Sequence, residues 1–132
     1  MWWLFDRAHV FRNREYAVVT ITEGSKLVHR AAIFPPYARF PFMADADLQV
    51  GDVWTDPDHR GGGLAAASLR FIRDACGRDH RQIWYLTAEA NEASRRAAQK
   101  AGFSLAGQGR RVGRRGVRML GAYVLDEVGA AC

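Results

Sequence analysis

The alternation of apolar and polar positions divides the first part of the chain into short segments with strand character. Residues 16–22 and 27–34 are rich in β-branched and apolar side chains, and residues 23–26 (EGSK) between them are typical of a turn. These segments predict a β-hairpin. Residues 35–43 contain three prolines, which lack the backbone N–H that a strand needs. They predict a loop with exposed aromatic side chains.

Strands and helices are predicted in alternation over the middle of the chain. Leu48–Thr55 has the pattern of a strand, and an amphipathic helix is predicted over Leu64–Cys76. The expected buried face of this helix carries Leu64, Ser68, Phe71, Ile72 and Ala75. Residues 82–88 (QIWYLTA) are apolar on both faces, as in a central strand covered on both sides. Asn91 is expected to cap a second helix, which runs to about residue 101.

Residues 103–128 alternate weakly around Gly-Arg turns and predict a closing hairpin. The order of elements is therefore hairpin, strand, helix, strand, helix and hairpin. This order predicts an α/β (α+β) fold, in which a mixed, mostly antiparallel twisted sheet contains a parallel βαβ unit at its centre.

Length and composition fit one domain, which we expect to span residues 1–132. No apolar run approaches the roughly 20 residues that cross a bilayer, and the start lacks a basic leader and a cleavage site. We therefore expect a cytoplasmic protein with no membrane partner. Cys76 and Cys132 have no zinc-ligand spacing, so no metal is expected. The formal net charge of +5 fits an anionic partner.

Three consecutive glycines, Gly61, Gly62 and Gly63, stand between the predicted strand and the first helix. Because glycine has no Cβ, the backbone N–H groups of such a loop can turn toward a ligand. The first turn of the helix adds unpaired donors and the positive end of the helix dipole. Arg60 stands just before the glycines and can add a charged contact. The loop therefore predicts a site for a diphosphate.

Three other interpretations of this loop can be weighed. A Walker A loop needs Gly-Lys-Ser/Thr at the helix start, and Leu64 and Ala65 stand there instead, so that motif is excluded. Residues 61–66 formally satisfy the Rossmann pattern G-x-G-x-x-A, but the preceding hairpin and the short chain do not fit that fold. A glycine turn that serves only the backbone geometry stays open.

The residues in and after the loop resemble the GNAT (Gcn5-related N-acetyltransferase) superfamily. The phosphate loop of that family is Q/R-x-x-G-x-G/A, and Arg60, Gly63 and Ala65 stand at its three fixed positions. Residues 91–94 (NEAS) are similar to the family's N-x-x-S helix start. Residues 100–103 (KAGF) are similar to its K-x-G-F helix end. The resemblance implies a GNAT-like sheet with a shortened N-terminal region.

The resemblance covers about residues 48–103 and implies an N-acetyltransferase. Such an enzyme moves an acetyl group from acetyl-CoA to an amine, on a small molecule or a peptide, by direct attack in a ternary complex. The pantetheine arm would pair with the backbone at Val53 and Thr55 as an added strand does. A backbone N–H near Trp54 or Thr55 would polarise the thioester carbonyl. The diphosphate would lie beside Arg60. Its oxygens would be held by the N–H groups of Gly61, Gly62, Gly63, Leu64, Ala65 and Ala66.

The same resemblance implies that Asn91 and Ser94 contact the cofactor. An asparagine at this place equally well caps its helix, and both interpretations stay open. Many family members have a tyrosine where Ala98 stands in this chain, so the usual proton donor for the leaving thiolate is absent. Tyr85 is the substitute that the sequence offers. A thiol is a tolerable leaving group without proton donation, so the difference does not exclude transfer.

An amine nucleophile is mostly protonated near pH 7, so a group or water chain should accept its proton before attack. Some relatives use a glutamate early in the strand before the loop, where this sequence has Gln49 and then Asp52. Asp52 is the predicted base. Its rivals are Asp56, His59 and Glu89.

Only residues 1–15 precede the first predicted hairpin, which is fewer than the family has there. We expect an acceptor site that is open, completed by another subunit or adapted to a large substrate. Burial between subunits of a homodimer, or in a pocket, would cover a set of apolar side chains. These are Trp2, Trp3, Phe5, Phe40 and Phe42.

Two other functions stay open. A noncatalytic, coenzyme A-binding or regulatory module would account for Ala98. Nucleic-acid binding would rest only on the charge of residues 110–118, which hold five arginines. That stretch has no interleaved aromatic residue on which bases could stack, so a solvated hairpin is favoured.

Overall fold

The computed structural model describes residues 2–114 and 117–127. Four strands form a sheet in the order β1-β2-β3-β4, where β1 is Ala17–Glu23, β2 is Lys26–Phe34, β3 is Leu48–Thr55 and β4 is Ile83–Tyr85. β1, β2 and β3 pair antiparallel, and Gly24 has a φ of 59° in the turn between β1 and β2. The first predicted hairpin is therefore confirmed.

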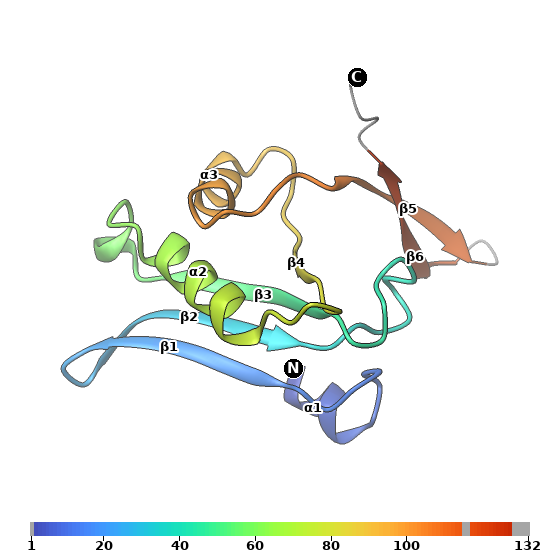
Figure 1. The fold of residues 1–132 in the computed structure, drawn as a ribbon, viewed down its shortest axis with the longest axis horizontal. Helices are drawn as coiled ribbons and strands as arrows, with labels where there is room; N and C mark the ends of the chain where they lie inside the picture. The colour runs from blue at the N-terminus through green and yellow to red at the C-terminus, as the bar shows by residue number, and fades with distance from the viewer. Residues whose placement is uncertain (1, 115–116, 128–132) are drawn as a thin grey trace.

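β4 pairs with β3 in parallel, because the chain crosses between them through the helix α2, Leu64–Cys76. The second helix, α3 (Glu92–Lys100), packs on the same face of the sheet as α2 (Figure 1). The buried residues of this core are Ala31, Ile33, Leu48, Val50, Leu69, Ile72 and Ala101. The predicted parallel βαβ unit within a mixed sheet is confirmed. β4 is shorter than predicted, and it lies at the edge of the described four-stranded sheet, so the expectation of a central strand is wrong.

The buried face of α2 differs from the predicted one. Ser68 and Ile72 are buried as expected, and Leu69 is buried as well. Phe71 is 60% exposed, and Ala75 is also exposed. Apolar side chains occur on two neighbouring stripes of this helix, and only one of them faces the sheet. The expected burial of Phe71 and Ala75 is therefore wrong.

The opposite face of the sheet is covered by an aromatic cluster. Its buried members are Phe11, Ala32, Phe34, Tyr37, Phe40 and Met43. Residues 35–43 form neither strand nor helix, as their prolines predict, but most of their aromatic side chains pack against this face. The expectation of an exposed aromatic loop is therefore wrong. The N–H of Arg12 donates to the Pro36 carbonyl at 3.0 Å and holds the loop against the N-terminal segment.

Both ends of the described chain add to the prediction. A short helix, α1 (Trp2–Arg7), precedes β1 where no helix is expected. β5 (Gly107–Arg114) and β6 (Val117–Glu127) form the predicted hairpin, but as a separate two-stranded sheet that stands away from the four-stranded one (Figure 1). The ring of Tyr123 stacks on that of Phe40, with centroids 5.4 Å apart, and joins the hairpin to the aromatic cluster.

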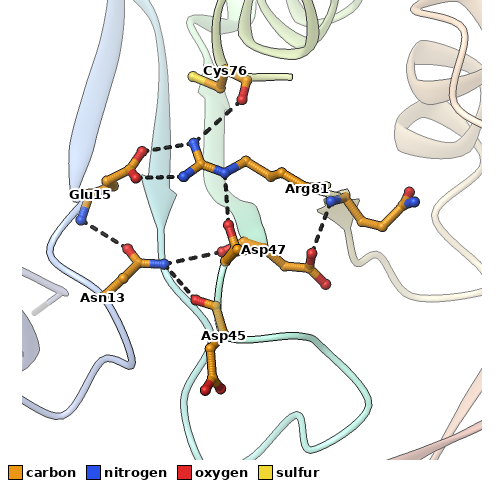
Figure 2. Close-up of polar contacts among 8 residues, drawn as sticks. Asn13, Glu15, Asp45, Asp47, Cys76 and Arg81 are labelled. Atoms are coloured by element: carbon orange, nitrogen blue, oxygen red, sulfur yellow. Dashed lines mark hydrogen bonds and ion pairs between the residues drawn. The ribbon is translucent and has the colours of Figure 1, made fainter. Parts of the chain in front are cut away.

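A polar network joins the N-terminal segment to the sheet (Figure 2). The Arg81 side chain is 9% exposed, and its guanidinium binds both carboxylate oxygens of Glu15. This contact holds the pKa of Glu15 below its ordinary value of 4.5. Asp47 is also buried, and it accepts from the N–H of Gln82 at 2.9 Å and from Nε1 of Trp84 at 2.8 Å. The network therefore secures the end of the sheet at which β3 and β4 begin.

Candidate functional site

β3 and β4 are paired over only three residues and then part. The paired residues run from Leu48, opposite Ile83, to Val50, opposite Tyr85. β4 ends at Tyr85, whereas β3 continues to Thr55. Beyond Val50, therefore, the described part of the chain places no strand beside β3 on this side.

A cleft of about 330 Å³ opens where the two strands part. It is lined by Gly51, Asp52, Val53, Tyr85, Leu86, Thr87, Ala88, Asn91 and Ser94. The structure thus brings together five residues of the predicted site from two strands and a helix start. Residues 54, 55 and 60–66 do not line the cleft, and they follow it along the chain toward the start of α2.

Asp52 is the one charged residue among those that line the cleft. Its φ is 48°, a conformation that a non-glycine residue rarely adopts, and the register between β2 and β3 shifts beside it. The irregular backbone turns the Asp52 carboxylate toward Arg30 of β2, and the Oδ1 to Nη2 distance is 3.4 Å. Both side chains are about half exposed. The strained residue therefore borders the cleft, while its carboxylate pairs with Arg30 on the β2 side of β3.

The glycine loop has the backbone conformation of an anion site. Gly61 and Gly63 have φ values of 82° and 81°, and Gly63 caps α2 without a side-chain hydrogen bond. Among the described residues, no hydrogen bond uses a backbone N–H of residues 61–66 as donor. A Cβ built on Gly61 or Gly63 would have nothing within 4 Å, so the space above these two residues is open. Six consecutive donors are therefore available to a ligand.

Arg60 lies at the start of this loop with its side chain exposed. Its Nε donates to the carbonyl of Thr55 at 3.2 Å, which folds the side chain back toward the end of β3. The Nη groups have no hydrogen bond or ion pair among the described contacts, so a bound anion can still take them.

The segment between β3 and the glycines is fixed to the first hairpin. Asp56 accepts from the Asp58 N–H at 3.0 Å, and its other carboxylate oxygen lies 2.8 Å from Nζ of Lys26. The Lys26 contact is the main cause that lowers the pKa of Asp56. His59 lies 3.2 Å from a carboxylate oxygen of Glu23. Asp56 and His59 therefore hold the loop in place, outside the cleft, which leaves Asp52 better situated as a base.

His29 is a buried polar residue at this site that the sequence prediction did not include. It lies on β2 opposite Thr55 and is fully buried, and its Nδ1 is 2.8 Å from Oγ1 of Thr55. Its Nε2 has no hydrogen-bond partner among the described residues. Burial lowers the pKa of His29 from its ordinary value of 6.5, so the ring is neutral near pH 7. A histidine within a run of strand residues gives no sequence signal of this contact.

Asn91 both caps α3 and lines the cleft. Its side-chain oxygen accepts from the Ser94 N–H at 3.1 Å, and its Nδ2 is left for another partner. The two interpretations of this residue are therefore compatible. Glu89 is exposed, and its carboxylate lies 3.5 Å from Nε2 of Gln108, outside the cleft lining.

Tyr85 also contacts both the cleft and the core. It lines the cleft, and its ring packs beside Phe103 with centroids 6.4 Å apart. Ala98, at the usual tyrosine position, packs against the core below α3.

Gln49 is buried on the other face of β3, and its Oε1 has no partner among the described residues.

Of the apolar side chains expected to be covered, the described ones have different surroundings. Phe40 is buried in the aromatic cluster, and Phe42 packs on Trp84 with centroids 5.1 Å apart. Trp3 is 52% exposed on α1. The side chains of Trp2 and Phe5 lie outside the described ones.

The cleft and the glycine loop together fit a ligand with an extended arm and a diphosphate. The free side of β3 can pair with the arm, and the six N–H donors can bind the phosphate oxygens. Within residues 2–114 and 117–127, no group of three or more His, Cys, Asp or Glu could hold a metal ion. In the same residues, no helix is long and apolar enough to span a bilayer.

Comparison with known proteins identifies a family and a similar fold. The profile of the acetyltransferase (GNAT) family matches residues 2–103. The fold is similar to the solved structure of a proposed acetyltransferase from Agrobacterium tumefaciens strain C58, with a TM-score of 0.60 and 18% sequence identity. That match covers 82% of this chain and 75% of the other. No curated protein sequence matches this chain significantly.

Proposed function

Since the chain belongs to the acetyltransferase (GNAT) family, we propose that it transfers an acetyl group from acetyl-CoA to an amine acceptor by direct attack in a ternary complex. The observation that supports the donor most directly is the row of six unpartnered N–H groups at residues 61–66. The first N–H groups of any helix lack intrahelical partners, and the glycines extend this set of donors by three residues, which suits the several oxygens of a diphosphate.

Each predicted donor-site residue has a place in this proposal. Gly61, Gly62, Gly63, Leu64, Ala65 and Ala66 hold the diphosphate by their N–H groups, and Arg60 adds its charge. The backbone of Val53 and Thr55 binds the pantetheine arm at the free side of β3. Asn91 and Ser94 border the cleft from the start of α3 and contact the same ligand.

The transfer itself joins the amine nitrogen to the acetyl carbon and breaks the bond from that carbon to sulfur. Asp52 takes the proton that the amine must lose, because it is the one carboxylate that borders the cleft. A backbone N–H near Trp54 or Thr55 stabilises the charge on the carbonyl oxygen. The nitrogen loses its second proton to water after it has bonded to the acetyl carbon. Tyr85 gives a proton to the thiolate, which leaves as the thiol of coenzyme A, and Tyr85 takes a proton back from solvent.

Calorimetric titration with acetyl-CoA tests donor binding. We expect saturable binding, and we expect Arg60→Glu to weaken it about tenfold or more, since a carboxylate then stands beside the phosphates. Arg14→Glu is the control, because it makes the same change of charge at an exposed arginine whose side-chain hydrogen bond, within the described residues, goes to His9. Equal affinity of the wild type and Arg60→Glu would contradict the placement of the diphosphate.

A thiol-release assay over a panel of small amines and peptides then separates an enzyme from a noncatalytic coenzyme A-binding module. The second function is favoured by one observation, the alanine at position 98 in place of the usual tyrosine. We expect release of thiol that depends on the amine and falls about a hundredfold in Asp52→Asn. Binding of acetyl-CoA without any release would support the module instead. Nucleic-acid binding predicts no saturable heat with acetyl-CoA.

The location and assembly of the protein stay predictions. We propose a cytoplasmic, single-domain enzyme, and a homodimer remains one way to complete the acceptor site. Light scattering on the purified protein measures its mass, and a monomer at working concentration would remove the dimer from the proposal.

A further inference from the structure

Two opposite charges, one of them on a residue that borders the cleft, meet on the face of the sheet opposite α2. Arg30 and Trp54 are cross-strand partners, as are Ala32 and Gly51, so their side chains or Cα hydrogens share one face. Asp52 reaches the same face through its irregular backbone, and its carboxylate lies 3.4 Å from the Arg30 guanidinium. Each side chain is close to half exposed, at 46% for Arg30 and 47% for Asp52. A ligand can therefore reach both.

The proposed chemistry indicates which kind of acceptor could bind to this ion pair. An acceptor amine enters as an ammonium group, and Asp52 must contact it before it can take the proton. The Asp52 carboxylate then exchanges its contact with Arg30 for one with the ammonium. A simple alkylamine would leave the Arg30 guanidinium without an anion, whereas an amine that carries its own carboxylate would supply one.

A third polar group lies on this face, although it does not line the cleft. Gln49 lies on β3 two residues before Gly51, and it is the cross-strand partner of Phe34 and the parallel partner of Trp84. It is only 5% exposed, and its Oε1 has no hydrogen-bond partner among the described residues. A buried amide oxygen without a donor is an unfavourable arrangement, and an ammonium group carries three N–H donors.

We propose that the acceptor is an amine with a carboxylate on the adjacent carbon, as in an α-amino acid. Asp52 binds its ammonium and Arg30 binds its carboxylate, so the two ion pairs replace the single pair of the free protein. The guanidinium and carboxylate are planar and complementary, which favours a two-point contact. This inference rests on the proposed acetyl transfer and specifies its substrate class.

The test compares amino acids with the amines that lack only the carboxylate. Suitable pairs are phenylalanine and phenethylamine, alanine and ethylamine, and lysine and cadaverine. Thiol release is measured at saturating acetyl-CoA, and binding of each compound to the coenzyme A-bound protein is measured by calorimetry. We expect kcat/KM and affinity to be about tenfold higher for the carboxylated member of each pair.

Substitutions at Arg30 assign that preference to its charge. Arg30→Ala should bring the ratio within each pair close to one, mainly by raising KM for the amino acid. Arg30→Glu should reverse it, so that cadaverine becomes better than lysine. Arg110→Ala is the matched control, because it removes another cross-strand ion pair, at 3.3 Å from Asp126, which does not border the cleft. It should leave the ratio unchanged. Urea midpoints of all variants show that they are folded.

The outcomes separate this inference from the proposed function. Equal thiol release from both members of the pairs would leave acetyl transfer standing and overturn the assignment of Arg30. Equal losses for both members in Arg30→Ala would also overturn it, since the residue would then act on the fold alone. If acetyl-CoA gives neither heat nor thiol, the proposed function fails. If acetyl-CoA binds without turnover, the absence of tighter amino-acid binding overturns the inference by itself.

Discussion

The buried imidazole of His29 should make the stability of this protein depend on pH in a window where carboxylates contribute little. The ring is fully buried and has one hydrogen-bond partner, Thr55, so burial lowers its pKa below the 6.5 of an exposed histidine. In the unfolded chain the same residue takes up a proton near pH 6.5. Stability is therefore greatest above pH 6.5 and falls as the pH decreases toward the folded pKa.

The size of this effect follows from the number of protons bound in each state. A difference of one proton changes the free energy of unfolding by about 1.4 kcal/mol per pH unit. Between pH 6.5 and 5.5 the unfolded His29 goes from half to almost fully protonated, so a folded ring that stays neutral makes the loss about 1 kcal/mol. The carboxylate of Glu15 acts at lower pH, because its pKa lies below 4.5.

Urea denaturation at pH 7.5, 6.5 and 5.5 measures this loss, and His29→Asn is the comparison. Asparagine can keep a polar atom near Thr55 but does not titrate, and the three other histidines are common to both proteins. We expect the loss between pH 6.5 and 5.5 to be smaller in His29→Asn, by up to about 1 kcal/mol. The affinity for acetyl-CoA should also fall less between pH 6.5 and 5.5 in His29→Asn. The Thr55 hydroxyl contacts His29, and the Thr55 carbonyl accepts from Nε of Arg60. Parallel pH profiles of the two proteins would refute the reasoning.

Three further changes test other parts of the fold. Gly51→Ala adds a Cβ that would lie 2.9 Å from Cε1 of Phe34, and we expect this overpacking to lower the free energy of unfolding by about 1–3 kcal/mol; an unchanged urea midpoint would contradict the contact. Glu15→Gln should destabilise the protein by at most about 1 kcal/mol at pH 7, because the carboxylate is half exposed. Because the folded pKa of Glu15 is lowered, the stabilisation by its carboxylate is fully present above pH 4.5 and is lost as the pH falls through the folded pKa. The melting temperatures of wild type and variant should therefore converge in acid. A difference that stays constant with pH would count against the Arg81 contact. Gly63→Ala forces a side chain into a φ of 81° at a cost of about 1–2 kcal/mol, and calorimetry should show weaker acetyl-CoA binding; normal affinity would mean that this conformation is not needed.

The sequence predicts the middle of the fold because local signals and tertiary contacts agree there. The glycines at 61–63 end one element and begin another, and Asn91 begins α3 where its side chain accepts from the Ser94 N–H. The βαβ unit follows from that order, since parallel strands need a crossover connection. The same signals identified the glycine loop, whose conformation is set by residues close together in the sequence.

Where the prediction is wrong, distant contacts decide the structure. Residues 86–88 continue an apolar run, yet β4 ends at Tyr85, where the strands part. Residues 35–43 read as an exposed loop because nothing local shows that β2 offers an aromatic surface to them. The first turn of α1 has no acidic residue that would indicate a helix start. Local patterns cannot report which surfaces will meet.

The candidate site, too, could be predicted only where local sequence signals determine it. Asp52 is a candidate by position in the strand, but its positive φ and its contact with Arg30 depend on the pairing of β2 with β3. His29 was missed for the same reason. A side chain whose role depends on a partner 26 positions away gives no local pattern.

The parting of β3 from β4 also has a consequence for handling the protein. A strand whose backbone lacks a neighbour on one side attracts any extended polypeptide, including the same segment of another molecule. A ligand that occupies this edge would block such self-association. The protein should therefore aggregate more slowly when it is purified and stored with coenzyme A. It should form soluble aggregates faster once the coenzyme has been dialysed away.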